Sequence, residues 1–403
     1  MPVKKIASLE VQIGMFVSSL DRPWSETPFL FQGFMVKTQE DIEQLCNYSK
    51  YLYILVPDDE IEITGGRGSA FGEKLNRKHY AIEVDASEEI EACRISHNEI
   101  SLLVEEIEEV IDSDSELLAH KVKKPVEVMV GSVNRNPDAY VWLTRLKKFH
   151  SYLYRDSLSA SVWASVLGRQ LGLAEEDLES LATGVMLMDT GKTSLPQALL
   201  EKHDRLTMEE WELMKTHVQR GVDMLSAGEK FIPDVMETVL THHERLDGSG
   251  YPSGLKGRQI PLFGQIAGIV DFYVSVTTPR PYAKPISPSK AIAMLYEQKG
   301  RYFDEELVSN FIEVLGTYPT GSLVELSTGE VGVIMSQNPG LRLKPNIVLL
   351  LNPDKRPYSI HPNINLISYT QGESNLPVKI IKTLPDGAYG IQLHKLSKRL
   401  QRG

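Results

Sequence analysis

The sequence predicts a multidomain fold, in which an all-α helical bundle lies between a small strand-containing N-terminal domain and a small β-rich C-terminal unit. Three observations predict it. Apolar residues recur with helical spacing from about Ser87 to Leu315, short β-branched and aromatic runs precede that block, and runs ending near Gly or Asn-Pro follow it. A length of 403 residues leaves room for roughly two or three domains.

The N-terminal domain is expected over residues 1–60. Its apolar runs VQIGMFVSSL and YLYILVP have the composition of strands, and DRPWSETP, which precedes the run FLFQGFMV, has the composition of a loop. The residues that follow are polar and rich in glycine, as in ITGGRGSAFGEK. They predict a flexible linker over 61–95.

The helical domain is expected over 96–318, with its core over 140–318, and the β-rich unit over 319–403. Two helix starts are marked by the sequence: Ser287 stands as an N-cap before Pro288, and Pro233 opens another helix. The segments SLVELSTGEVGVIMS and NIVLLLNP predict hairpin strands in the C-terminal unit.

Composition and charge restrict the class of protein. A chain that is 42% hydrophobic and 24% charged is typical of a soluble globular protein. The net charge of −11 argues against a broad surface for DNA, RNA or anionic membranes, but it leaves room for a small basic pocket. The two cysteines, Cys46 and Cys93, form no zinc pattern. With no signal-peptide core and no run near the ~20 apolar residues of a membrane span, a cytoplasmic protein is expected.

Two acids lie in line with apolar helix faces. Asp189 continues an apolar stripe, and a buried carboxylate costs several kcal/mol unless a cation or donors receive it. A cap at the helix end is the alternative for this residue. Asp156 is in line with the inner face of the preceding helix, where a solvated first-turn acid is the simpler alternative. The stripe before Asp189 consists of Leu178, Leu181, Ala182, Val185 and Met186.

The segment THHERLDGSGYP, from Thr241 to Pro252, carries the most informative pattern in the chain. His242 and His243 are the i+3 and i+4 neighbours of Val239, so both imidazoles project from roughly one side of a helix. Two such histidines followed by Glu244 and Asp247 are typical of metal ligands and of the groups that orient them.

Other residues extend this candidate site. Gly248 and Gly250 permit a tight turn that leads into Tyr251–Pro252. His217 and Asp271 occupy helical positions elsewhere in the middle block. Inward acids and histidines on several helices are how a helical bundle builds a metal site, and coincidence is the alternative for the set.

The motif H-H-E-x-x-D-G-x-G-Y-P, preceded by x-D-x-G-K and a lone histidine, resembles the HD-GYP family of the HD phosphohydrolase superfamily over about residues 140–320. The resemblance implies a cyclic di-GMP phosphodiesterase, which opens its substrate with a water or hydroxide held between metal ions, commonly iron or manganese. The flanking segments are similar to members that carry an extra N-terminal domain.

The resemblance also assigns site residues and exposes two departures. The family's first-helix histidine falls on Asp156, and the histidine of the His-Asp pair falls on Met188. A carboxylate at Asp156 could replace imidazole for manganese, whereas the neutral thioether of Met188 is a poor donor to such ions. The resemblance therefore implies one divalent ion, iron or manganese, rather than two. The matching positions are Asp189, His217, His242, His243 and Asp271 for metal, and Lys192 for phosphate.

Three hypotheses of function follow. In the first, the protein is a regulator or receptor in cyclic di-GMP signalling with hydrolysis lost or strongly reduced, because two ions are needed to clamp both the attacking and the leaving oxygen. The GYP segment would then contact a protein with a diguanylate-cyclase domain. In the second, it is an active metal-dependent phosphodiesterase in which Asp156 replaces a histidine. In the third, His242 and His243 hold one ion for stability alone.

Overall fold

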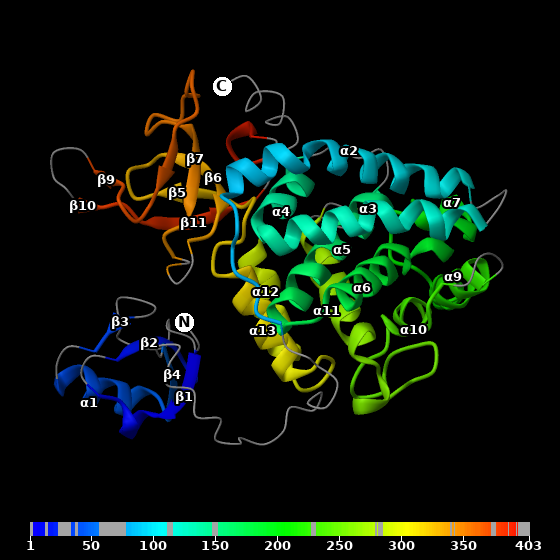
Figure 1. Ribbon diagram of the computed structural model, residues 1–403, viewed down its shortest axis with the longest axis horizontal. Coiled ribbons are helices and arrows are strands. Elements are labelled where there is room, and N and C mark those ends of the chain that lie inside the picture. Colours follow the sequence, from blue (N-terminus) through cyan, green and yellow to red (C-terminus); the bar gives the residue numbers. More distant parts are fainter. Residues whose placement is uncertain are drawn as a thin grey trace. The chain divides into compact units, whose positions relative to one another are not determined.

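Figure 1 presents the computed structural model of the 403-residue chain. The chain forms two compact units, Met1–Ser69 and Ala70–Gly403. Most of the predicted loop at 21–28 and residues 61–77 of the predicted linker lie outside the described residues. The structure describes residues 3–12, 15–22, 34–36, 39–55, 78–110, 116–146, 152–226, 231–278, 280, 285–338, 341, 343–371, 376–385, 387–391 and 393.

The first unit is a four-stranded antiparallel sheet of order β1-β4-β2-β3, accompanied by one helix. The strands are β1 (Val3–Ala7), β2 (Phe16–Leu20), β3 (Phe34–Met35) and β4 (Tyr51–Leu55), and the helix is α1 (Gln39–Tyr48). The predicted strand content is confirmed, whereas α1 was not predicted. Ile42 and Leu45 of this helix pack against the core of the unit, and most of its other residues are polar.

The second unit begins its helices close to Ser87, where helical spacing was expected to begin. The helix α2 (Ala86–Val110) starts inside the segment 61–95 that was expected to be a linker. The Asp85 carboxylate accepts a hydrogen bond from the amide of Ser87 at 2.8 Å and so caps the first turn. Ile90 and Cys93 face the core, whereas Ser87, Glu88 and Glu91 are exposed.

A set of long helices forms the centre of the second unit (Figure 1). Trp163 of α5 makes edge-to-face contacts with Tyr273 of α11 and Phe311 of α13, with ring centroids 5.8 and 5.9 Å apart. These aromatic pairs join three helices that are distant in sequence. The central helices are α3 (Glu116–Arg135), α4 (Pro137–Leu146), α5 (Tyr152–Leu171), α6 (Glu175–Leu187), α11 (Leu262–Thr277) and α13 (Glu305–Leu315).

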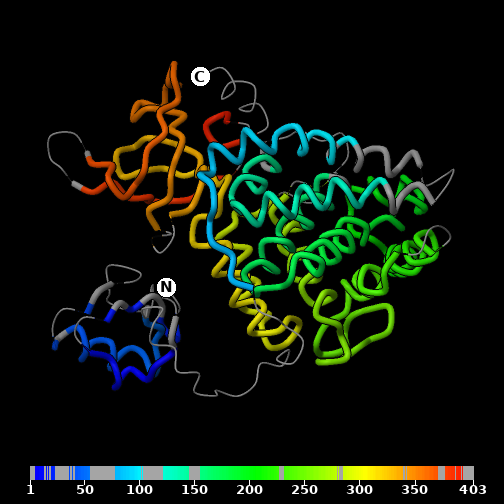
Figure 2. The backbone as a smooth tube through the Cα atoms, viewed as in Figure 1, coloured from blue at the N-terminus to red at the C-terminus, as the bar shows by residue number. Residues whose placement is uncertain are grey.

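Shorter elements connect α6 to α13, and Figure 2 allows the path of the backbone to be followed through them. Both predicted helix starts are confirmed. Pro233 is the first residue of α10, and Ser287 caps α12 by accepting a hydrogen bond from the Lys290 amide. The connecting elements are η4 (Thr190–Ser194), α7 (Gln197–Leu200), α8 (Met208–Lys215), α9 (His217–Ser226), α10 (Pro233–Thr241), η5 (Gly257–Gln259) and α12 (Pro288–Gln298).

The C-terminal part is a five-stranded antiparallel sheet of order β11-β5-β6-β7-β8, which confirms the predicted β-rich unit. Trp142 of α4 is buried in one core of this sheet, and Asp138 accepts hydrogen bonds from Thr320 and Gln337. The sheet is therefore packed directly on the helices. Its strands are β5 (Leu323–Leu326), β6 (Val331–Ser336), β7 (Asn346–Leu351), β8 (Asn363–Asn365) and β11 (Ile380–Leu384), and β9 (Thr370–Gln371) and β10 (Leu376–Pro377) pair beside it.

Among the described residues, no helix combines the length and the apolar composition that crossing a membrane requires.

Candidate metal centre

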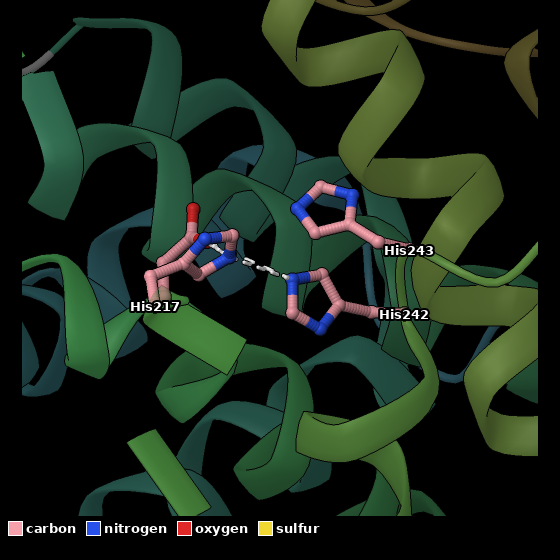
Figure 3. Close-up of side chains that lie close together, drawn as sticks. His217, His242 and His243 are labelled. Carbon is pink, nitrogen blue, oxygen red and sulfur yellow. Dashed lines mark hydrogen bonds and ion pairs between the residues drawn. The ribbon is translucent and has the colours of Figure 1, made fainter. Parts of the chain in front are cut away.

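Four side chains from three places in the second unit meet at one point: Asp189, His217, and the adjacent His242 and His243. Each offers one ligand atom, and these atoms lie within 4.8 Å of one another. Asp189 stands between α6 and η4, His217 begins α9, and His242 caps the C-terminal end of α10. Figure 3 shows the three imidazole rings gathered around a common space. The sequence placed the histidine pair on a helix, whereas the helix ends at Thr241, just before it.

Backbone carbonyls set the orientation of two of the imidazoles. His217 Nδ1 lies 2.7 Å from the carbonyl oxygen of Met214, and His242 Nδ1 lies 2.7 Å from that of Val239. A carbonyl oxygen can only accept, so each Nδ1 carries the hydrogen and donates it. Each neutral ring then presents its Nε2 lone pair to the centre, which is the tautomer of a metal-bound histidine.

The distances between the ligand atoms suit one ion. His217 Nε2 and His242 Nε2 are 3.5 Å apart, and they lie 3.4 and 3.7 Å from Asp189 Oδ1. Two atoms bound at ~2.1 Å to one tetrahedral ion lie about 3.4 Å apart. Asp189 Oδ1 is buried and accepts no hydrogen bond from any described residue. Three lone-pair donors with no proton between them therefore fit a divalent cation.

Charge and burial keep these groups in the ligating state. Burial alone would raise the pKa of Asp189, but the neighbouring Lys192 ammonium holds that pKa well below its usual range. Lys192 Nζ donates to Asp189 Oδ2 at 2.6 Å. Desolvation lowers the pKa of His217 and of His243, so both rings remain neutral.

Asp156, the predicted substitute ligand, lies apart from the four converging residues. Its Oδ1 accepts hydrogen bonds from Arg155 and from Thr278 at 2.9 Å, and its Oδ2 accepts from Arg280 Nε at 3.1 Å. Because two guanidinium groups and a hydroxyl engage both oxygens, this arrangement does not support Asp156 as a metal ligand. Met188, at the second departing position, is buried at the end of α6 with 2% exposure.

Asp271 lies at the edge of the centre. Its Oδ2 is 3.9 Å from His243 Nδ1, and it is not one of the four residues whose ligand atoms converge. Asp271 also acts on Arg245, whose pKa is lowered by burial and partly restored by this carboxylate. The structure therefore relates Asp271 to His243 and Arg245.

Glu244 folds the segment that follows the histidine pair. Its two carboxylate oxygens accept hydrogen bonds from the amides of Ser253 and Leu255 at 2.8 and 2.9 Å, and the residue is 4% exposed. The sequence expected Glu244 to orient a ligand. In the structure Glu244 closes the loop between residues 244 and 255.

The remaining motif residues shape the same loop. Gly248 has a φ of +80°, and a Cβ at Gly250 would lie 2.4 Å from the Arg245 amide nitrogen, so both positions require glycine. Asp247 Oδ1 accepts from the amide of Ser249 at 3.0 Å. The turn carries Tyr251 over His243, with the rings stacked 4.6 Å apart, and Pro252 follows on the exposed side.

A cavity of about 770 Å³ opens beside the centre, and its walls include His217 and His243. Five Lys or Arg side chains line it against two carboxylates, although the whole chain carries a net charge of −11. Three aromatic side chains also line it. The cations are Lys192, Arg205, Lys215, Arg245 and Arg280, and the aromatic residues are Trp211, Tyr251 and Phe272.

Apart from Lys192 and Tyr251, these basic and aromatic lining residues were not identified from the sequence. They come from α8 and the loop before it, from the loop after α10, and from α11 and the residues that follow it, and no shared motif joins them. One sequence feature could have indicated a basic cavity: the segments KHDR and MKTH carry basic residues in a chain that is acidic as a whole. Such a cavity accepts an anionic ligand with flat rings.

The comparisons with known proteins agree with this geometry. The family model for the HD domain matches residues 137–307, and a domain of unknown function (DUF3391) matches residues 3–126. The cyclic di-GMP phosphodiesterase PA4108 of Pseudomonas aeruginosa is 30% identical over 359 residues, which cover 86% of this chain and 84% of that protein.

Two further relatives match a shorter part of the chain. The cyclic di-GMP phosphodiesterase response regulator RpfG of Xanthomonas campestris is 36% identical over 167 residues, covering 40% of this chain and 44% of its own. A cyclic di-GMP phosphodiesterase of Thermotoga maritima is 35% identical over 149 residues, covering 37% and 40%.

Proposed function

Because this chain is a member of the HD-GYP family of HD domain proteins, with an N-terminal accessory domain, we propose that it is a cyclic di-GMP receptor with a one-ion site. It binds the intact cyclic dinucleotide in the basic cavity and hydrolyses it slowly or not at all. It acts as a cytoplasmic regulator in cyclic di-GMP signalling.

The observation that carries this proposal is the difference between the two metal positions that the family resemblance implies. At the first, Asp189, His217 and His242 direct three donor atoms at one point. At the second, the Asp156 carboxylate forms ion pairs with two arginines, and Met188 has only a thioether. Imidazole and carboxylate together suit iron(II) or manganese(II). We expect about one ion per chain for this reason.

The lining of the cavity supports a cyclic dinucleotide as the ligand. Lys192, Arg245 and Arg280 offer fixed positive charge to phosphate groups, and Trp211 and Tyr251 offer flat surfaces to the bases. When bound, one ion would supply Lewis-acid charge, but the clamp on attacking and leaving oxygens needs two. Loss of several kcal/mol of such stabilisation slows hydrolysis by orders of magnitude, since each 1.36 kcal/mol is tenfold.

The same proposal includes a protein partner with a diguanylate-cyclase domain, which the family resemblance implies. The turn that carries the Gly-Tyr-Pro segment leaves Asp247, Ser249 and Pro252 exposed, so a partner can reach it.

The second candidate function is an active phosphodiesterase. It is favoured by the relative PA4108, a cyclic di-GMP phosphodiesterase that is 30% identical over most of this chain.

Turnover and binding measured together test the proposal. The protein would be reconstituted anaerobically with iron(II) or manganese(II) and incubated with cyclic di-GMP, with His242→Ala/His243→Ala as the blank. We expect calorimetric binding of the intact ligand and product formation close to that of the blank. Turnover clearly above the blank supports the phosphodiesterase instead, and no binding with either metal refutes the receptor.

A further inference from the structure

A buried ion pair joins Arg280, which lines the cavity, to Asp156 on α5. Asp156 Oδ2 lies 3.1 Å from Arg280 Nε and 3.0 Å from Arg280 Nη2, and the two side chains are only 7% and 13% exposed. Arg280 follows α11 and is 124 residues away from Asp156, which lies on α5. The pair therefore ties the residues after α11 to α5.

The Asp156 carboxylate is itself held in place. Thr278 Oγ1 donates to its Oδ1 at 2.9 Å, and Arg155 donates to the same oxygen at 3.1 Å. A carboxylate fixed from three sides holds the guanidinium that it contacts in one orientation. Arg280 lines the cavity together with Lys192, whereas Arg155 does not line it.

We propose that Arg280, held by Asp156, supplies the fixed positive charge that a second metal ion would otherwise bring to a phosphate group in this cavity. Asp156 is then a positioning residue for ligand binding and not a metal ligand. This inference rests on the proposed function, because it takes a cyclic dinucleotide as the ligand.

The residues at positions 156 and 188, where this chain departs from the family motif, favour a guanidinium in place of a second metal ion. A guanidinium keeps its charge at all physiological pH values and forms paired hydrogen bonds with both carboxylate and phosphate oxygens. Met188 leaves an apolar, 2%-exposed side chain where the family resemblance places an imidazole. Met188 therefore removes a metal donor, and Asp156 provides a carboxylate that anchors the Arg280 guanidinium.

Binding of cyclic di-GMP, measured by calorimetry in excess chelator as well as with manganese(II), tests the role of Arg280. We expect Arg280→Gln to weaken binding about 10- to 100-fold in both conditions, because a charged hydrogen-bond donor is lost. Asp156→Asn should weaken it on the order of threefold to tenfold, and Asp156→Glu should restore part of the loss.

Arg135→Gln is the matched control, because Arg135 also pairs with a buried carboxylate, that of Glu89, and does not line the cavity. It should change the dissociation constant by less than about twofold while perturbing the local packing in a similar way. Equal affinities of wild type and Arg280→Gln would overturn the inference and leave the receptor function standing.

The number of metal ions bound per chain tests this inference separately from the proposed binding of cyclic di-GMP. Elemental analysis after manganese(II) loading and gel filtration should give about one ion per wild-type chain. The double variant Asp156→His/Met188→His should take up a second. Two ions in the wild type would overturn the inference whether or not cyclic di-GMP binds.

Discussion

Gly191 and the backbone carbonyl of His217 lie so close that a Cβ at Gly191 would stand 2.0 Å from that oxygen. The same Cβ would be 2.4 Å from the amide nitrogen of Gly221. The short η4 helix therefore packs backbone against backbone on α9. Because Asp189 precedes η4 and His217 opens α9, this contact sets the separation of two of the four converging side chains.

Replacing Gly191 by alanine should disrupt the metal centre without changing any ligand. The added methyl group must push α9 away, which we expect to cost about 1–3 kcal/mol of unfolding free energy and to weaken manganese binding. Thermal unfolding and metal titration measure the two effects. Gly131→Ala on α3 is the control, because its nearest contact is 3.6 Å away, and it should be neutral or stabilising. Equal behaviour of the two variants would contradict this account.

Metal binding should stabilise the protein through the four converging residues. Without an ion, Asp189 Oδ1 is a buried acceptor that receives no hydrogen bond from the described part of the chain. A ligand present at 100 times its dissociation constant adds ~2.7 kcal/mol, so manganese(II) should raise the Tm of the wild type. The rise should vanish in His217→Ala and persist in His361→Ala, a histidine of the C-terminal sheet region. A rise that survives in His217→Ala would place the ion elsewhere.

Glu244→Gln should loosen the loop that carries Tyr251. The carboxylate accepts from two amides, and an amide side chain can accept with only one of its two heavy atoms. We expect a loss of about 1–3 kcal/mol in unfolding free energy and faster hydrogen exchange at Ser253 or Leu255. Glu209→Gln, at an exposed position of α8, should change stability by less than ~0.5 kcal/mol. A variant as stable as the wild type would show that these two bonds do not hold the loop.

Trp211 should report ligand binding directly. Its side chain is 46% exposed at the cavity wall and meets Tyr251 edge to face, with ring centroids 6.1 Å apart. A base stacked on an aromatic side chain gains ~1–3 kcal/mol. Cyclic di-GMP should therefore quench tryptophan fluorescence in the wild type, and Trp211→Phe should abolish most of the change while retaining some affinity. Quenching of equal size in Trp211→Phe would assign the signal to another tryptophan.

Acid should weaken the C-terminal sheet through Glu325. Hydrogen bonds from Lys355 and Lys382 lower its pKa from the ordinary 4.5 to about 2. A lowered folded-state pKa gives stability that is present above pH 4.5 and is lost as the pH falls toward 2. The Tm difference between wild type and Glu325→Gln should be largest near neutral pH and should narrow below pH ~4.5. A difference that stays constant across this range would exclude the linkage.

Local patterns predicted the parts of the site that are close together in sequence. His242 and His243 are neighbours, and Asp189 continues an apolar helical stripe, so both signals were readable without a fold. The environment of Asp156 was not readable, since its partner Arg280 is 124 residues away and reaches it only through the packing of α11 on α5. The adjacent Arg155 was the one local sign that this carboxylate could be paired with a guanidinium.

The same distinction explains the fold. Helix starts marked by Ser287–Pro288 and Pro233 were predicted because capping depends on neighbouring residues. The helix α1 was not, since few of its residues are apolar. The basic cavity was also missed, because its cations converge from several loops.

The position of Trp142 has a consequence for how the protein can be divided. Its indole belongs to α4 but fills a core made by β5, β6 and β7, and Asp138 on the same helix binds Thr320 and Gln337. A chain ending after Tyr318 would expose this indole and leave the Asp138 carboxylate without both donors. The HD-type helices and the C-terminal sheet should therefore melt as one calorimetric transition, and a protease that cuts between them should yield unstable fragments rather than two independent domains.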